Sequence, residues 1–135
     1  MPLLDHVGVK VTDLDRSIKF YTELFGFEMV DRRMLGSSKV EAAALKVGGS
    51  LVFLLHNAEF KARSGEEHGG VDHFCLTFNN NEFEAIRNRM EKMNVKLEGA
   101  LQPRTGATGR SPSQYILDPD NNQIEVKTGL GEHGS

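Results

Sequence analysis

Two histidines and one glutamate occupy strand-like positions in the sequence and could together bind a divalent metal ion. His6 and His73 stand 67 residues apart (73 − 6), each directly after an aspartate at the start of an alternating apolar–polar segment. Glu125 lies in a third such segment, between Ile124 and Val126. Two imidazoles and a carboxylate are a ligand set for Zn(II), Fe(II), Mn(II) or Ni(II) that leaves coordination positions open for a substrate.

Strand alternation predicts that both histidines point away from the apolar face of their segments. In residues 4–11 the valines share one face, and His6 lies on the other. Residues 71–78 repeat this pattern, with His73 on the less apolar face. If the two halves of the chain pair about a pseudo-twofold axis, the two histidines converge in one concave site.

The histidine segments open two similar halves of the chain, and each half has the pattern of a βαβββ module. The first module covers residues 1–57 and the second covers residues 69–128. Each has one helix after its first strand, and the predicted strands are residues 4–11, 27–33, 41–47, 50–56, 71–78, 96–101, 114–117 and 123–127. Residues 58–68 are predicted as a polar linker and residues 129–135 as a flexible tail. The fold class is therefore α+β, and neither module, at about sixty residues, would bury a sufficient core alone.

Composition limits the partners and the location of the protein. The chain of 135 residues has 16 basic and 19 acidic residues, a formal net charge of −3 and no basic run, which disfavours binding to nucleic acid or to an anionic membrane. Its longest apolar stretch, residues 51–55, is far shorter than the roughly 20 residues of a membrane-spanning helix. Since there is one cysteine and no signal-peptide pattern, we expect a cytoplasmic protein without an internal disulfide.

Several motifs resemble the vicinal oxygen chelate superfamily, which contains glyoxalases, bleomycin-resistance proteins and extradiol dioxygenases. The motifs are Leu4-Asp5-His6-Val7, residues 13–21 with Phe25-Gly26-Phe27, Asp72-His73, and the turn and strand at residues 118–125. The resemblance covers residues 3 to about 128. It implies paired modules that form a U-shaped mixed-sheet barrel with flanking helices around one divalent metal ion, frequently in a homodimer. The matching ligand positions are His6, His73 and Glu125.

One position departs from the four-ligand members of the superfamily. Glyoxalase I enzymes and methylmalonyl-CoA epimerases have a fourth ligand on the last strand of the first module, where this sequence places Phe53 or, one residue away, Val52. Neither side chain binds a metal ion. His56 lies near the end of the same strand and is either a further ligand or a rim residue. The three-ligand pattern resembles extradiol dioxygenases and fosfomycin-resistance enzymes instead.

The resemblance implies an enzyme whose small substrate chelates the metal through adjacent oxygens, in extradiol-type dioxygenase, lyase or transferase-like chemistry. Residues 127–130 differ from the segment usual in fosfomycin enzymes, which disfavours fosfomycin itself as the substrate. The alternative is a metal-free protein that binds a small molecule of the antibiotic type, like the bleomycin-sequestering members. Retention of all three ligand positions favours the enzyme.

Two charged segments could supply further site residues. Glu41 resembles in position a general base of the fosfomycin enzymes, and is otherwise a solvated glutamate at a strand end. Residues 104–110 are a glycine-rich, basic segment that is predicted as a loop. This loop is either a mobile lid that brings Arg104 or Arg110 to an anionic substrate, or an ordinary connector.

Three other side chains are predicted to contact the substrate. Phe53 and Tyr115 are expected to form walls of the pocket. Cys75 follows His73 by two residues and therefore shares its face. Its thiol either lines the pocket or is a small buried apolar group.

Overall fold

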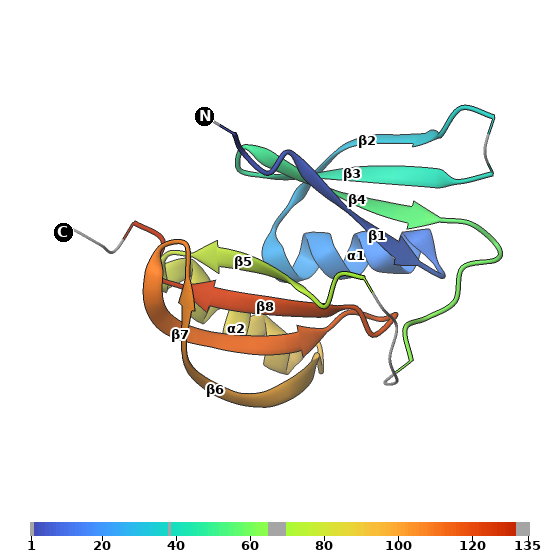
Figure 1. The fold of residues 1–135 in the computed structure, drawn as a ribbon. Coiled ribbons are helices and arrows are strands. Elements are labelled where there is room, and N and C mark those ends of the chain that lie inside the picture. The colour runs from blue at the N-terminus through green and yellow to red at the C-terminus, as the bar shows by residue number, and fades with distance from the viewer. Residues whose placement is uncertain (1, 38, 65–69, 132–135) are drawn as a thin grey trace. The chain divides into compact units, whose positions relative to one another are not determined.

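Each half of the chain forms one βαβββ module in the computed structural model, which describes residues 2–37, 39–64 and 70–131. The chain divides into two compact units, Met1–Ser64 and Gly65–Ser135. The first unit contains β1 (His6–Val11), α1 (Leu14–Phe25), β2 (Glu28–Met34), β3 (Glu41–Val47) and β4 (Ser50–His56). The second contains β5 (Phe74–Phe78), α2 (Asn80–Lys92), β6 (Lys96–Gly106), β7 (Gly109–Leu117) and β8 (Gln123–Thr128). The predicted α+β class with two βαβββ modules is confirmed (Figure 1).

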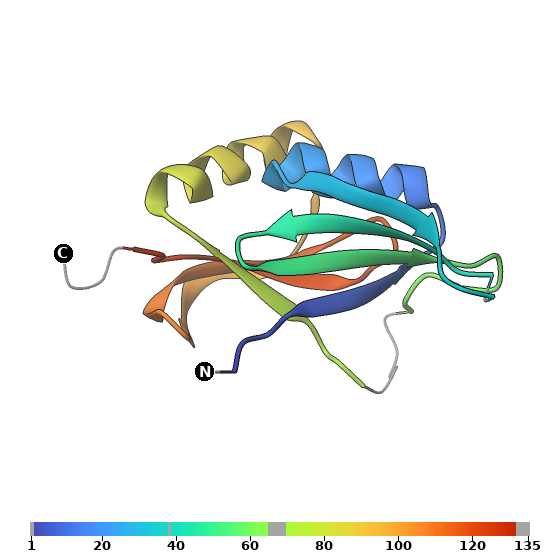
Figure 2. The ribbon, with the colours of Figure 1, turned by 90° about the horizontal axis from the view of Figure 1, so that it is seen from above.

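Both units build a four-stranded mixed sheet with the same plan. The strand orders are β1-β4-β3-β2 and β5-β8-β7-β6. In each sheet the first strand pairs in parallel with the last strand, and the other neighbours are antiparallel. Helix α1 packs against β2, β3 and β4, and α2 packs against β5 and β8 (Figure 1, Figure 2). One face of each sheet is therefore covered by the helix of its own unit.

Both helices begin at side-chain caps. The Asp13 carboxylate accepts a hydrogen bond from the Arg16 N–H at 3.0 Å, and α1 ends at Gly26, whose φ of 73° favours glycine. Asn79 and Glu82 form a reciprocal capping box at the start of α2. The caps fix the residue at which each helix begins after the preceding strand.

Burial along the first strand of each unit follows the predicted alternation. Val9 and Val11 are buried in β1, whereas His6 is exposed. Leu76 and Phe78 are buried in β5, with more accessible residues between them. The apolar side chains face the helix, so the opposite face of each sheet is the one to which the alternation assigns His6 and His73.

The segment at residues 104–110, predicted as a loop, is instead the end of a β-hairpin. Strands β6 and β7 both extend beyond their predicted bounds, and their pairing continues to Gly106 and Gly109. A bulge in β6 allows this strand to bend and continue. The two glycines of the segment are typical of a loop, but Gly106 and Gly109 lie opposite one another at the end of the hairpin.

Three further expectations concern the chain as a whole. The predicted linker, residues 58–68, and the predicted tail, residues 129–135, lie partly outside the described residues. No helix within the described ranges is long and apolar enough to cross a membrane. The single cysteine, Cys75, is a free thiol.

A buried aspartate holds the turn that leads into β8. Asp118 is 3% exposed, and its Oδ1 accepts hydrogen bonds from the backbone N–H groups of Asp120 at 2.9 Å and Asn122 at 2.8 Å. Its Oδ2 accepts a third bond from the Asn122 side-chain amide at 2.9 Å. The turn sets where β8 begins, and with it the position of Glu125.

We expect Asp118→Ala to lower the free energy of unfolding by about 2–4 kcal/mol, because it leaves three N–H donors without their acceptor. Urea denaturation followed by circular dichroism measures the loss. The matched variant Asp118→Asn keeps one carbonyl oxygen as an acceptor and should lose about 1–2 kcal/mol. Equal losses in the two variants would contradict this account of the turn.

Candidate metal centre

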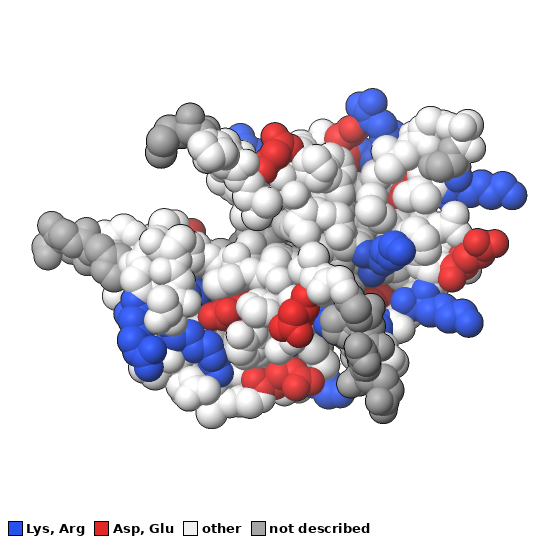
Figure 3. All heavy atoms as spheres, in the orientation of Figure 1, with Lys and Arg blue, Asp and Glu red and all other residues white. Residues whose placement is uncertain are grey.

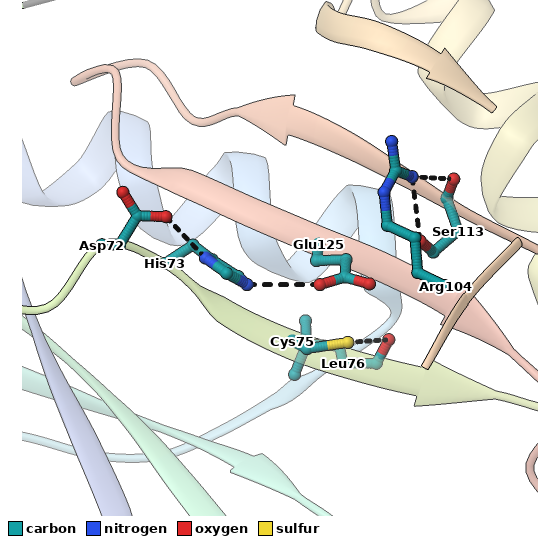
Figure 4. Close-up of polar contacts among 7 residues, drawn as sticks. All are labelled: Asp72, His73, Cys75, Leu76, Arg104, Ser113 and Glu125. Carbon is teal, nitrogen blue, oxygen red and sulfur yellow. Dashed lines mark hydrogen bonds and ion pairs between the residues drawn. The ribbon is translucent and has the colours of Figure 1, made fainter. Parts of the chain in front are cut away.

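The second unit brings His73 and Glu125 together at one end of the parallel ladder. His73 directly precedes β5, and Glu125 lies in β8 opposite Cys75. The His73 Nε2 atom lies 3.2 Å from the Glu125 Oε1 atom (Figure 4). The Glu125 side chain is 8% exposed and the His73 side chain 29%. The imidazole can therefore be reached from outside while the carboxylate is held within the sheet.

Each predicted histidine ligand is paired with the aspartate that precedes it. His73 Nδ1 lies 2.7 Å from an Asp72 carboxylate oxygen, and His6 Nδ1 lies 2.7 Å from an Asp5 carboxylate oxygen. When Nδ1–H donates to the carboxylate, Nε2 presents its lone pair to a metal ion. A carboxylate on the second ring nitrogen is the usual support of a metal-binding histidine. The repeated Asp-His pair was visible in the sequence, but the role of the aspartates was not inferred from it.

Tyr115 and Arg104 form a polar wall beside this pair. The Tyr115 and His73 rings meet edge to face with centroids 5.0 Å apart, and the Arg104 guanidinium lies 4.6 Å from the centre of the Tyr115 ring. Arg104 also donates to the Ser113 carbonyl at 2.6 Å (Figure 4). Burial raises the pKa of the Tyr115 phenol, and the charge and hydrogen bond of Glu125 raise it further. The phenol therefore remains a neutral donor.

Electrostatic interactions at the candidate site come from individual charged side chains and not from a surface patch of one sign. Figure 3 shows basic and acidic side chains interspersed over the face that it presents, and such a surface gives no strong field of one sign. Arg104 lies on the His73 side of the second sheet through its contact with Tyr115. Arg110 pairs with Thr105 one position along the hairpin and points to the opposite face. Of the two arginines considered, the structure brings Arg104 to the site.

Cys75 shares the face of His73 and Glu125. Of the two alternatives for Cys75, the fully buried apolar group is excluded, since the residue is exposed. Its Sγ lies 3.9 Å from the Leu76 carbonyl oxygen, and partial burial raises the pKa of the thiol from 9.0 to about 12, with a further contribution from the Glu125 charge. The alternation of β5 brings the thiol to the site face, while the open edge of the sheet leaves it accessible.

In the first unit, Phe53 occupies the position that corresponds to Glu125. Gly8, two residues after His6, pairs with Phe53, as Cys75, two residues after His73, pairs with Glu125. The Phe53 and His6 rings meet edge to face at 4.9 Å. Val52 is 2% exposed and faces the other side of the sheet. The fourth-ligand position of the first unit is therefore apolar and lies beside His6.

Glu41 is not brought beside His6. Its carboxylate accepts a hydrogen bond from Arg32 at 3.0 Å, and the same guanidinium binds Asp15 of α1 at 2.7 Å. This places Glu41 on the helix-covered face of the sheet, whereas His6 lies on the opposite face. Glu41 therefore joins β2 and β3 to α1 through Arg32.

His56 lies on the same helix-covered face as Glu41, with which it pairs across β3 and β4. Its Nδ1 atom lies 3.1 Å from the Val11 carbonyl oxygen. The ring is thus held at the end of the sheet, away from the face of His6.

The donor set of the second unit fits a divalent metal ion in part. Imidazole nitrogen and carboxylate oxygen are ligands of Zn(II), Mn(II), Fe(II) and Ni(II). Two observations favour the fit. His73 Nε2 lies close to a Glu125 carboxylate oxygen, and His73 Nδ1 is paired with the Asp72 carboxylate. Among the described residues of this unit, no further His, Cys, Asp or Glu completes a metal-binding group of three. A metal ion held by His73 and Glu125 would need at least one further ligand from outside this unit.

Comparison with known proteins gives consistent matches over nearly the whole chain. A family model described as Glyoxalase/Bleomycin resistance protein/Dioxygenase superfamily matches residues 3–126. The virulence protein STM3117 of Salmonella typhimurium is 30% identical over 91% of this chain and 81% of its own. The glutathione transferase FosA of Serratia marcescens is 27% identical over 93% of this chain and 80% of its own. The crystal structure of a glyoxylase/bleomycin resistance protein/dioxygenase domain from Frankia sp. EAN1pec has a TM-score of 0.78 at 20% identity, over 96% of this chain and 98% of that one.

We expect the Cys75 thiol of metal-free protein to react with iodoacetamide at pH 8 roughly a hundredfold more slowly than an ordinary thiol. The raised pKa leaves less thiolate at this pH, and the greater nucleophilicity of a more basic thiolate offsets part of the loss. The rate should keep rising above pH 9, because the thiol pKa is about 12. The same chain unfolded in urea is the control, and a plateau near pH 9 in the folded protein would contradict the prediction.

Proposed function

Because the chain belongs to the Glyoxalase/Bleomycin resistance protein/Dioxygenase superfamily, we propose that it is a divalent-metal-dependent enzyme acting on a small substrate that binds the metal through adjacent oxygens. The observation that carries the proposal is that the His73 ring contacts two carboxylates. Its Nδ1 is paired with Asp72, and its Nε2 lies 3.2 Å from a carboxylate oxygen of Glu125. A relative named as a glutathione transferase supports an enzymatic role. The reaction is of the extradiol dioxygenase, lyase or transferase type.

His6, His73 and Glu125 would hold the ion, which is Zn(II), Fe(II), Mn(II) or Ni(II). When bound, the ion supplies Lewis-acid polarisation of the substrate oxygens. Asp5 and Asp72 orient the two imidazoles through Nδ1. Phe53, at the position where a fourth protein ligand would stand, leaves coordination positions for the substrate.

The neighbouring side chains bind and orient the substrate in this proposal. Tyr115 keeps a neutral hydroxyl whose proton goes to Glu125, so its oxygen can accept a hydrogen bond from a substrate hydroxyl. The Arg104 guanidinium packs over the Tyr115 ring and helps to hold it in place. Phe53 offers an apolar surface next to His6. These contacts favour a substrate with an oxygen-rich end and an apolar body.

We expect the parent protein to bind one divalent ion per chain, and His73→Ala and Glu125→Ala each to abolish this binding while the fold is kept. Asp72→Ala should weaken it about 10–100-fold, because the imidazole loses its supporting carboxylate. His56→Ala is the matched control and should bind like the parent, since this ring lies on the other face of its sheet. Calorimetric titration with Zn(II), Mn(II) and Ni(II), with elemental analysis, measures the binding.

Metal binding by both ligand variants at the affinity of the parent would refute the assignment of the ligands. A parent protein that binds none of these ions would favour the alternative, a metal-free protein that binds a small molecule.

We further propose a homodimer, with an expected mass of twice the 15.0 kDa chain in light-scattering measurements. His6 and the His73–Glu125 pair then meet either within one chain or between two chains. Refolding a mixture of His6→Ala and Glu125→Ala chains distinguishes these arrangements. Pairing between chains restores intact sites in the mixed dimers, whereas pairing within a chain restores none. A monomeric protein would refute the dimer.

A further inference from the structure

Strand β2 forms an open edge of the first sheet. It is the last strand in the order β1-β4-β3-β2, and no strand within the described ranges pairs with its outer side (Figure 1). A bulge at Val30 leaves residues 31–34 as a regular segment paired with β3. An edge strand of this kind has backbone N–H and C=O groups that can pair with another strand, and β2 contains no proline that would prevent it.

Exposed apolar side chains gather on this edge. They are 38–54% exposed and comprise Met29, Val30 and Met34 of β2 and Leu35, which follows it. The other edge strand of the same sheet, β1, carries no exposed large apolar side chain. A cluster of exposed apolar groups at one edge is typical of a surface that is covered by a partner.

The charged residues of β2 make the strand complementary to itself. Asp31 and Arg33 lie on one face and form an exposed ion pair at 2.6 Å within the chain. Consider two copies of β2 that run antiparallel about a two-fold axis at Arg32. Asp31 of each copy then lies directly opposite Arg33 of the other, so two ion pairs form between the chains. In the same register, Met34 of each copy comes beside Val30 of the other.

The neighbouring registers lack this complementarity. An axis at Asp31 places two aspartates opposite each other, and an axis at Arg33 does the same with two arginines, which destabilises a strand pair. An axis at Arg32 also brings two arginines together. Each of them, however, binds the Asp15 carboxylate at 2.7 Å and the Glu41 carboxylate at 3.0 Å in its own chain. The charge of Arg32 is therefore compensated before the copies meet.

We propose that two copies of this chain associate through antiparallel pairing of their β2 strands about a two-fold axis at Arg32. The two first sheets then form one sheet of eight strands, four from each copy. The inference rests on the homodimer proposed above and assigns its surface. A two-fold contact uses the same patch on both partners, which is the symmetry that the charges of β2 satisfy. Because an edge-to-edge contact is small, the dimer should dissociate on dilution.

The surface is tested by exchanging its charges. Asp31→Lys places basic groups opposite each other at both ends of the pair, and Arg33→Asp does the same with acidic groups. Each variant alone should self-associate about tenfold more weakly than the parent, or less. Mixed in equal amounts, the two variants should form a heterodimer as stable as the parent dimer, because each charge then faces the opposite sign. Sedimentation velocity over a range of concentrations measures the association.

Two controls separate association from folding. The substitutions change exposed side chains, so circular dichroism and the free energy of unfolding should stay close to those of the parent. Glu84→Lys removes the acid of another exposed ion pair, formed with Arg87 on α2 at 3.5 Å, and should associate like the parent. Amide hydrogen exchange needs no variant: residues 31–34 of the parent should exchange more slowly in concentrated than in dilute protein.

Parent-like dimers of both single variants, or a mixture that forms no heterodimer, would overturn β2 as the surface and leave a dimer through another face. A parent protein that stays monomeric at every concentration would overturn the surface and the dimer together. Zn(II) titration of the same samples tests the metal site separately. A dimeric parent that binds no Zn(II) would overturn the metal site and leave the β2 surface standing.

Discussion

The parallel ladder between β5 and β8 positions the side chains of the candidate site in the second unit. It pairs Cys75 with Glu125 and Thr77 with Lys127, and it brings the His73 ring to 3.2 Å from the glutamate. Because β5 is an edge strand and β8 lies inside the sheet, the imidazole stays accessible while the carboxylate is buried. The sheet thus supplies one reachable ligand and one rigid ligand from neighbouring strands.

The first unit has the same ladder with different side chains. Phe53 stands opposite Gly8 and Leu55 opposite Lys10, at the positions where the second unit has its acidic and basic residues. The backbone plan is therefore repeated, whereas the chemistry of the last strand is not. On the proposed assignment, one unit contributes a single imidazole and an apolar wall, and the other contributes the charged groups.

The sequence was sufficient to predict features that follow from periodicity. Alternation in residues 4–11 and 71–78 placed both histidines on the face opposite the helix, and burial agrees with this. Contacts that depend on which strands are neighbours could not be read in the same way. Glu41 was considered beside a metal ion, but its position is set by Arg32 on β2 and by α1. Lys127 ends an alternating segment and was not singled out, because its burial depends on the hairpin, which was predicted as a loop.

The ladder that carries the site also has a consequence for the order of folding. It joins residues 50 positions apart in the chain (125 − 75), whereas the β6–β7 hairpin closes over neighbouring residues. Local contacts form early and distant pairings form late, because the entropy of loop closure must be overcome first. The hairpin and helix of the second unit can therefore assemble before the imidazole meets the carboxylate. Approach of these two groups is then a late event that marks the completed module.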